Sequence, residues 1–125
     1  MTIYRRIETS EVRGITVVSF VERKILEAAH IQELGEELQH VVEHDGNKDL
    51  LLDFDKVEFL SSAALNKLII LDKKVKARSG QLKFCNLMPE IREVFVITRL
   101  NQLFEIVETR DKALESFKRA TPATA

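Results

Sequence analysis

Two adjacent serines, Ser61 and Ser62, are the residues of this chain with the clearest potential for chemistry. They stand just ahead of a segment in which apolar residues recur at helical spacing, so we predict that they begin a helix. A serine at this place can cap the helix, because its hydroxyl oxygen accepts a hydrogen bond from an unpaired amide of the first turn. It can also be a phosphorylation site, since the first-turn amides and the helix dipole tolerate the charge of about −1.5 to −2 that a phosphoserine carries. The residues alone leave both interpretations open.

The segment HVVEH at residues 40–44 has the spelling of a zinc-protease motif, H-x-x-E-H. On a helix that turns about 100° per residue, however, His40 and His44 point away from the apolar stripe that starts at Ile31. A catalytic zinc also needs a third protein ligand and a cleft, and the sequence signals neither. We therefore predict no metal and a solvent-facing helix surface, with His30 at the surface too. A metal-dependent enzyme that uses His40 and His44 is the weaker alternative.

The other reactive residues are explained without catalysis. Cys85 alternates with apolar residues in the strand-like segment QLKFCNL at residues 81–87, which predicts a buried, unreactive thiol. Asp53 and Asp55 flank the end of a predicted central strand, where sites gather in parallel sheets, although turn formation explains them equally well. The four glycines form no phosphate-binding loop. We predict a protein without enzymatic activity and without a cofactor.

The composition indicates a single globular domain. The chain has 125 residues, of which 45% are hydrophobic and 31% are charged, and its net charge is −1. No basic run or basic aromatic strand is present, so nucleic acid is not an expected partner. No apolar stretch reaches transmembrane length, the N-terminal residues lack an apolar signal core, and the chain has one cysteine. These features favour a cytoplasmic protein without a membrane partner.

The hydrophobic periodicity predicts five strands and four helices. The strands are expected at residues 3–8, 12–21, 50–53, 81–87 and 104–108, and the helices at 27–45, 62–79, 89–100 and 111–120. From residue 26 onward strands and helices alternate, which predicts parallel crossovers, while the first two strands form an antiparallel hairpin. The fold class is therefore α/β, with one domain at residues 1–120, a mixed and mostly parallel sheet, and a disordered tail at 121–125.

The first hairpin also bears on self-association. Its second strand is rich in apolar residues, which are Val17, Val18, Phe20 and Val21. If this hairpin supplies an exposed edge of the sheet, it can pair with a second copy and form a homodimer.

Two longer blocks of sequence resemble the STAS domain family (sulphate transporter and anti-sigma factor antagonist). LLLDFDKVEFLSSAALNKL is similar to the family's strand, acidic residue, serine-containing turn and helix. The second block is LKFCNLMPEIREVFVITRLNQLFEI. It is similar to the family's later segment, in which a strand, the motif P-E-[IV], a helix and the motif L-x-x-L-F-x-[IV] follow one another. The resemblance covers nearly the whole chain and is strongest to the small stand-alone bacterial anti-sigma factor antagonists.

The resemblance implies a binding switch in a partner-switching pathway of bacterial transcription regulation. In that family an anti-sigma factor phosphorylates the serine that begins the helix. This partner is an ATP-binding serine kinase with a histidine-kinase-like fold, and the unphosphorylated antagonist binds it and releases the sigma factor. Carried over to this chain, the phosphorylated serine is Ser62, with Ser61 as the second choice in a place often held by aspartate. The alternative is a STAS scaffold without phosphorylation in a signalling or transport complex.

The resemblance also implies a partner-binding surface around Ser62. Glu27 matches an acidic position before the first helix, and Asp53 matches the acidic residue that closes the central strand, as a neighbour of the serine hydroxyl. Ala64 and Asn66 replace glycines that are common in the family. The full expected surface is Glu27, Asp53, Ser61, Ser62, Asn66 and Lys67.

Overall fold

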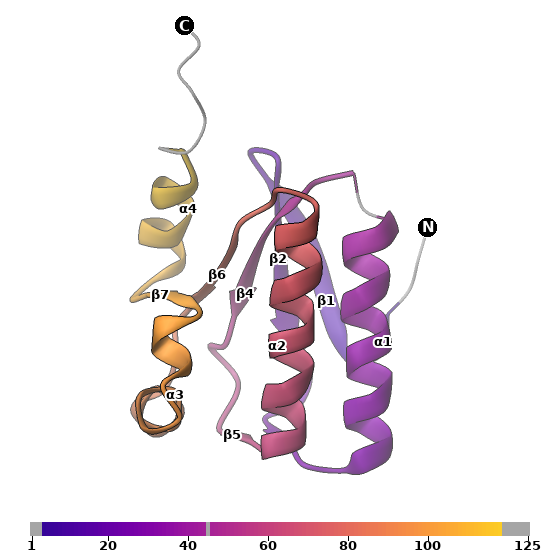
Figure 1. Cartoon of the computed structure of the whole chain (residues 1–125), viewed down its shortest axis with the longest axis vertical. Helices are drawn as coiled ribbons and strands as arrows, with labels where there is room; N and C mark the ends of the chain where they lie inside the picture. Colours follow the sequence, from indigo (N-terminus) through magenta and orange to yellow (C-terminus); the bar gives the residue numbers. More distant parts are fainter. Residues whose placement is uncertain (1–3, 45, 119–125) are drawn as a thin grey trace, which may run out of the picture.

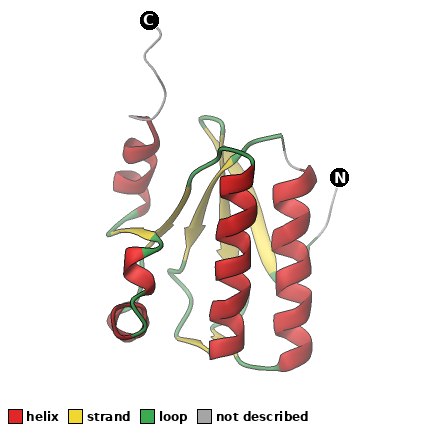
Figure 2. Cartoon of the chain, viewed as in Figure 1, coloured by secondary structure: helices red, strands yellow, loops and turns green. Residues whose placement is uncertain are grey.

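The computed structural model describes residues 4–44 and 46–118 and has the predicted α/β architecture (Figures 1 and 2). A five-stranded sheet has the order β1-β2-β4-β6-β7, and β3 and β5 form a second, two-stranded parallel sheet. The strands are β1 (Ile7–Val12), β2 (Ile15–Phe20), β3 (Lys24–Ile25), β4 (Asp49–Asp53), β5 (Phe59–Leu60), β6 (Leu82–Cys85) and β7 (Glu105–Val107). The helices are α1 (Ala28–His44), α2 (Ser62–Ala77), α3 (Pro89–Ile97), the 3₁₀ helix η1 (Leu100–Gln102) and α4 (Arg110–Lys118).

The β1–β2 hairpin is antiparallel, and every other neighbouring pair in the large sheet is parallel. Its two-residue turn is made by Arg13 and Gly14, which both have positive φ angles, as a type I′ turn requires. β2 lies between β1 and β4, so it is not an edge of the sheet. The edge that the hairpin supplies is therefore β1, whereas Val17 and Val18 of β2 are buried in the core.

The sheet is covered on both faces, as the alternation of side chains along β4 requires. Leu50 and Leu52 belong to the larger core with α1, α2 and α3, whereas Leu51 belongs to a smaller core under α4. Figure 1 shows α1 and α2 side by side on one face of the sheet. On the other face, α4 inserts its predicted inward residues, which are Ala113, Leu114 and Phe117.

The small β3–β5 sheet was not predicted, because two-residue strands are too short to show a periodic pattern. It fixes the chain just before α2, since the Ser61 amide donates to the Ile25 carbonyl at 3.1 Å and the Glu58 amide to the Arg23 carbonyl at 2.7 Å. The start of α2 is therefore tied to the chain just before α1. The tail predicted at 121–125 and the end of the last predicted helix lie outside the described residues.

Candidate functional site: the start of helix α2

Ser61 is the N-cap of α2. Its backbone is extended, with φ −78° and ψ 166°, and its Oγ accepts a hydrogen bond from the Ala64 amide at 3.2 Å. The Ser61 carbonyl accepts the first helical bond, from the Leu65 amide at 3.1 Å. The capping role that the sequence left open between two serines therefore belongs to Ser61.

Ser62 is the first residue of the helix and is exposed. Its hydroxyl makes no hydrogen bond with any residue in the described part of the chain. A group added to Ser62 Oγ would therefore break no observed contact. It would also lie beside the unpaired first-turn amides of α2, which favour negative charge.

Glu27 and Asn66 lie on the same side of the molecule as Ser62. Glu27 is exposed just before α1, where its carbonyl accepts from the Ile31 amide at 2.9 Å. Asn66 is exposed one helical turn after Ser62, and residues four apart are neighbours on a helix surface. The hydrogen bond between Ser61 and Ile25 holds the two helix starts together.

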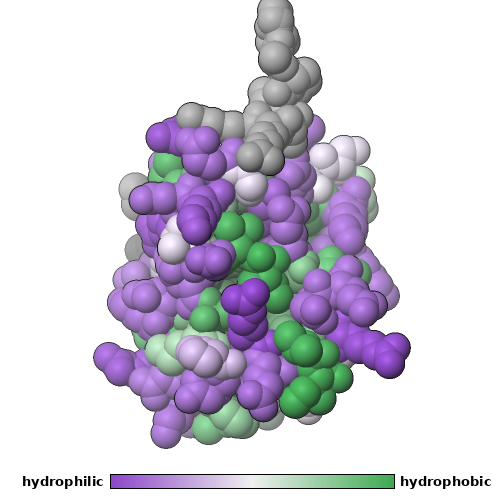
Figure 3. Space-filling model, turned by 90° about the vertical axis from the view of Figure 1, so that its left-hand side faces the viewer, coloured by the Kyte–Doolittle hydropathy of each residue, from purple (hydrophilic) through white to green (hydrophobic). Residues whose placement is uncertain are grey.

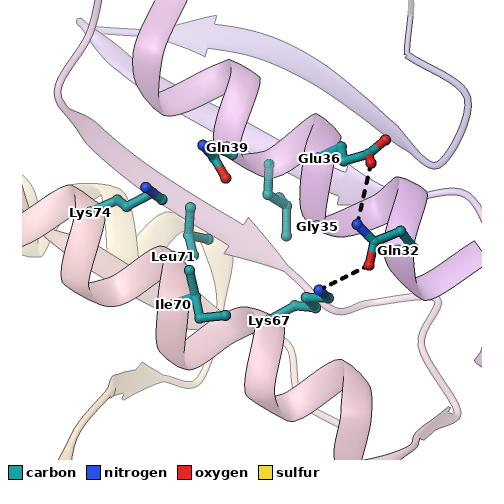
Figure 4. Close-up of a pocket in the computed structure, with 9 residues that line it drawn as sticks. Gln32, Gly35, Glu36, Gln39, Lys67, Ile70, Leu71 and Lys74 are labelled. Atoms are coloured by element: carbon teal, nitrogen blue, oxygen red, sulfur yellow. Dashed lines mark hydrogen bonds between the residues drawn. The ribbon is translucent and has the colours of Figure 1, made fainter. Parts of the chain in front are cut away.

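Lys67 is turned toward α1 and is half-buried. Its Nζ donates to Gln32 Oε1 at 3.3 Å, and its methylene stem lies over Gly35, where an added Cβ would come within 2.8 Å of Lys67 Cδ (Figure 4). Gln32 in turn donates to Glu36 Oε2 at 3.3 Å. Lys67 thus forms one wall of the groove between α1 and α2.

The groove beside Lys67 is small. It has a volume of about 80 Å³, and its walls include Gly35, Leu71, Ile70 and Lys74 (Figure 4). This space holds a few water molecules or one side chain, whereas a pocket for a drug-sized ligand or cofactor has roughly 300–1,000 Å³. The groove is therefore too small for a drug-sized ligand or a cofactor.

Asp53 does not take part in this surface, which corrects the expectation that it neighbours the serine hydroxyl. It is only 5% exposed, and its Oδ1 accepts from the Asp55 amide at 2.9 Å and from Asn86 Nδ2 at 3.0 Å. Its Oδ2 accepts from Arg110 Nε at 2.9 Å and Nη2 at 2.6 Å. The reason is the strand alternation, because Asp53 shares a face of β4 with Leu51, toward α4, whereas α2 lies on the other face.

The sequence also did not identify two exposed apolar residues near Ser62. Leu26 precedes Glu27, and Phe59 lies in β5 just before Ser61; each is about half exposed, at 49% and 46%. Exposed apolar side chains surrounded by polar residues are typical of protein contact sites. An apolar residue in a loop or in a two-residue strand carries no periodic signal, so this exposure becomes visible only in the structure.

The histidines of the HVVEH segment form no metal site in the described residues, which contain no cluster of three metal-ligating side chains. His40 is half-buried, with its Nδ1 hydrogen-bonded to Tyr4 Oη at 2.8 Å, and its ring stacks on His44 at 4.3 Å. His30 is half-buried beside Glu22, with 3.0 Å between Nδ1 and Oε2. Two of the three histidines are thus less exposed than predicted, because side chains from the N-terminal segment and the β2–β3 loop cover them.

Cys85 is buried, as predicted. Burial, with a smaller contribution from the Asp53 carboxylate, raises the pKa of its thiol to about 12. A thiol that stays protonated at neutral pH is a poor nucleophile.

None of the described helices is long and apolar enough to span a membrane.

The comparisons with known proteins identify the family of this fold. The family model of the STAS domain matches residues 6–113. The chain belongs to the STAS domain family. A Bordetella bronchiseptica relative, named as a candidate anti-sigma factor antagonist, BtrV, is 31% identical to this STAS domain over 98 residues, which are 78% of this chain and 84% of the relative.

Two solved structures show the same fold. An anti-sigma factor antagonist (STAS) domain protein from Planctomyces limnophilus has a TM-score of 0.78 at 22% identity, covering 88% of this STAS domain and 96% of the other chain. An anti-sigma factor antagonist from Mycobacterium paratuberculosis has a TM-score of 0.76 at 25% identity, covering 88% and 91%. Homologues and structural neighbours of this STAS domain are thus named anti-sigma factor antagonists.

Proposed function

We propose that this protein is a cytoplasmic anti-sigma factor antagonist whose STAS domain, residues 1–120, acts as a phosphorylation switch. It binds an anti-sigma factor that is an ATP-binding serine kinase, and this binding releases the sigma factor. Phosphorylation of Ser62 ends the interaction. The antagonist has no catalytic activity of its own; it accepts the phosphoryl group from ATP on Ser62 Oγ, and the kinase releases ADP and the hydroxyl proton.

The observation that carries the proposal is the division of roles between the two serines. Ser61 caps α2, so Ser62 Oγ is exposed and has no hydrogen bond in the described part of the chain. Phosphorylation of Ser62 therefore leaves the fold intact, while phosphorylation of Ser61 would remove the cap. A modification that changes the surface without unfolding the protein is what a reversible switch requires.

The surroundings of Ser62 explain how one phosphate can end binding. Leu26 and Phe59 provide apolar contacts, and Glu27 and Asn66 provide polar ones. A partner that covers this surface removes water from Ser62. A phosphate there must then lose its hydration and meets any acidic group of the partner, so both desolvation and repulsion oppose the complex.

The test is a pull-down from the source cell with the wild type, Ser62→Ala, Ser62→Asp and Ser61→Ala. Mass spectrometry identifies the captured proteins, and incubation with the captured kinase and ATP locates the phosphate. We expect capture of a kinase by the wild type, Ser62→Ala and Ser61→Ala but not by Ser62→Asp, and one phosphate on Ser62. Equal capture by all four proteins would replace the switch with a constitutive scaffold, and phosphate on Ser61 would overturn the assignment of roles.

A further inference from the structure

Gly35 lies in the interior of α1, where a glycine makes a helix less stable than an alanine would. Its φ angle is not positive, so the backbone does not require a glycine at this position. The described structure places the stem of Lys67 over it, and an added Cβ would lie 2.8 Å from Lys67 Cδ and 3.2 Å from Cε. The missing side chain therefore makes room for Lys67 and keeps the groove between α1 and α2 open (Figure 4).

The base of this groove is apolar. Leu38 of α1 and Leu71 of α2 line the groove and are buried, whereas Ile70 also lines it and is 39% exposed. A single exposed apolar residue is ordinary on a protein surface, but Ile70 borders a hollow with buried apolar walls. The volume of about 80 Å³ suits one apolar side chain of a partner.

The α2 wall of the groove carries two cations without a carboxylate partner in the described part of the chain. Lys67 Nζ donates to the amide oxygen of Gln32 at 3.3 Å, and Lys74 makes no hydrogen bond or ion pair with any described residue. The α1 wall carries one carboxylate, Glu36, which accepts a hydrogen bond from Gln32 (Figure 4). The lining thus has one more positive than negative charge, which favours an acidic partner.

The groove continues the Ser62 surface along α2. At about 100° per residue, Ile70 lies roughly 80° around the helix from Ser62, and Lys74 lies roughly 18 Å further along the axis at 1.5 Å per residue. An interface of ordinary size buries about 800 Å² on each partner, which is roughly 30 Å across. A single partner can therefore cover Ser62 and the groove together.

We propose that the groove between α1 and α2 binds one apolar side chain of the anti-sigma factor kinase, and that an aspartate or glutamate next to this side chain binds Lys74. This inference rests on the proposed function and adds the chemistry of the partner segment to it. Phosphorylation of Ser62 then decides when binding occurs, whereas the groove decides which kinase binds. A kinase with a basic residue at this place meets repulsion from Lys67 and Lys74, and such repulsion gives specificity.

Filling the groove tests the apolar part of the contact. Isothermal titration calorimetry with the kinase that the wild type captures should show that Gly35→Ala weakens binding about threefold or more, because the added methyl group occupies the space of the partner side chain. The Tm should stay equal or rise, since alanine favours a helix interior. A purely structural role of Gly35 would lower the Tm instead. Gly46→Ala is the matched control, because nothing lies within 4 Å of its added Cβ.

Charge substitutions test the acidic part of the contact. Lys74→Glu should weaken binding about fivefold, because attraction to a partner carboxylate becomes repulsion. Lys73→Glu changes the net charge equally at an exposed residue outside the groove lining, so it should change binding less than about twofold.

A charge at the exposed isoleucine of the groove tests both parts together. Ile70→Glu should weaken binding about tenfold or more, because its carboxylate would lose water beside an apolar hollow and meet the acidic partner. Ile97→Glu is the matched control. Ile97 is an isoleucine with 72% exposure at the end of α3, and Figure 3 shows the hydrophobic residues on the side of the molecule that carries α3, β7 and α4.

Cross-linking identifies the partner segment independently of affinity. Gln39 is exposed and lines the groove, so Gln39→Cys can be labelled with a benzophenone, while Cys85 is buried. The kinase peptide cross-linked on irradiation should contain an aspartate or glutamate beside an apolar residue. Replacing that acidic residue by lysine should restore the binding of Lys74→Glu. A cross-linked segment without a carboxylate, or a lysine replacement that restores nothing, would overturn the proposal.

Ser62→Asp in the same titration separates the groove from the switch, and circular dichroism verifies that each variant is folded. If Ser62→Asp loses the kinase while Gly35→Ala, Lys74→Glu and Ile70→Glu bind like the wild type, the switch stands and the groove proposal is wrong. If Ser62→Asp binds like the wild type and the three groove variants do not, the groove stands and the switch is wrong. A wild type that captures no kinase overturns both.

Discussion

Replacing each of the two serines by alanine separates the cap of α2 from the proposed switch. Ser61→Ala removes the oxygen that accepts from the Ala64 amide. Loss of a serine N-cap costs about 0.5–2 kcal/mol. The hydrogen bond is long, at 3.2 Å, which argues for the lower part of this range, but Ala64 is only 1% exposed, so water cannot readily replace the lost acceptor. We expect a loss of about 1 kcal/mol in the free energy of unfolding.

That loss corresponds to a fall in Tm of about 4 °C, taking an unfolding entropy of roughly 2.1 cal/mol/K per residue for a chain of this size. Ser62→Ala should change the free energy of unfolding by less than about 0.5 kcal/mol, because Ser62 is exposed and alanine favours the helix. Urea and thermal unfolding followed by circular dichroism measure both effects. Ser61→Asp should restore the stability, since aspartate caps helices as well as serine does. If Ser62→Ala were the destabilising variant and Ser61→Ala were neutral, the division of roles between the serines would be wrong.

Three further substitutions test the packing behind the site. Folding raises the pKa of the Cys85 thiol from 9.0 to about 12, so the stability gained from keeping this thiol neutral is complete below pH 9 and is lost as the pH rises toward 12. Between these pH values, the free energy of unfolding measured with urea should therefore fall less for Cys85→Ala than for the wild type. Gly80→Ala should cost about 2 kcal/mol or more in thermal unfolding, because its Cβ would collide with the Lys48 carbonyl oxygen, and an unchanged Tm would contradict this. Arg110→Ala should lower the free energy of unfolding, measured with urea at neutral pH, by about 2 kcal/mol, because it leaves the buried Asp53 carboxylate without its ion-pair partner. This loss is smaller than for a fully buried ion pair, since the Arg110 side chain is 41% exposed. The same substitution should cost less in a protein that already carries Asp53→Asn.

The sequence could predict the parts of the fold that follow a repeating pattern. Five apolar positions of α1, from Ile31 to Val42, recur at helical spacing and are all buried. Leu50, Leu51 and Leu52 form an uninterrupted apolar run because β4 is packed on both faces. The start of α2 could also be located, since a hydroxyl residue before a periodic segment has a local physical cause in the unpaired amides of the first turn.

The features that the sequence could not predict depend on residues that meet only after folding. Asp53 and Arg110 are 57 positions apart, and their contact depends on α4 covering the face of the sheet opposite α2. The partner of a carboxylate at a strand end is set by the face on which it lies, and a register shift of one residue would have pointed Asp53 toward α2. The order of the strands was also not determined, so the sequence did not show which strand of the first hairpin forms the edge, and that strand is β1.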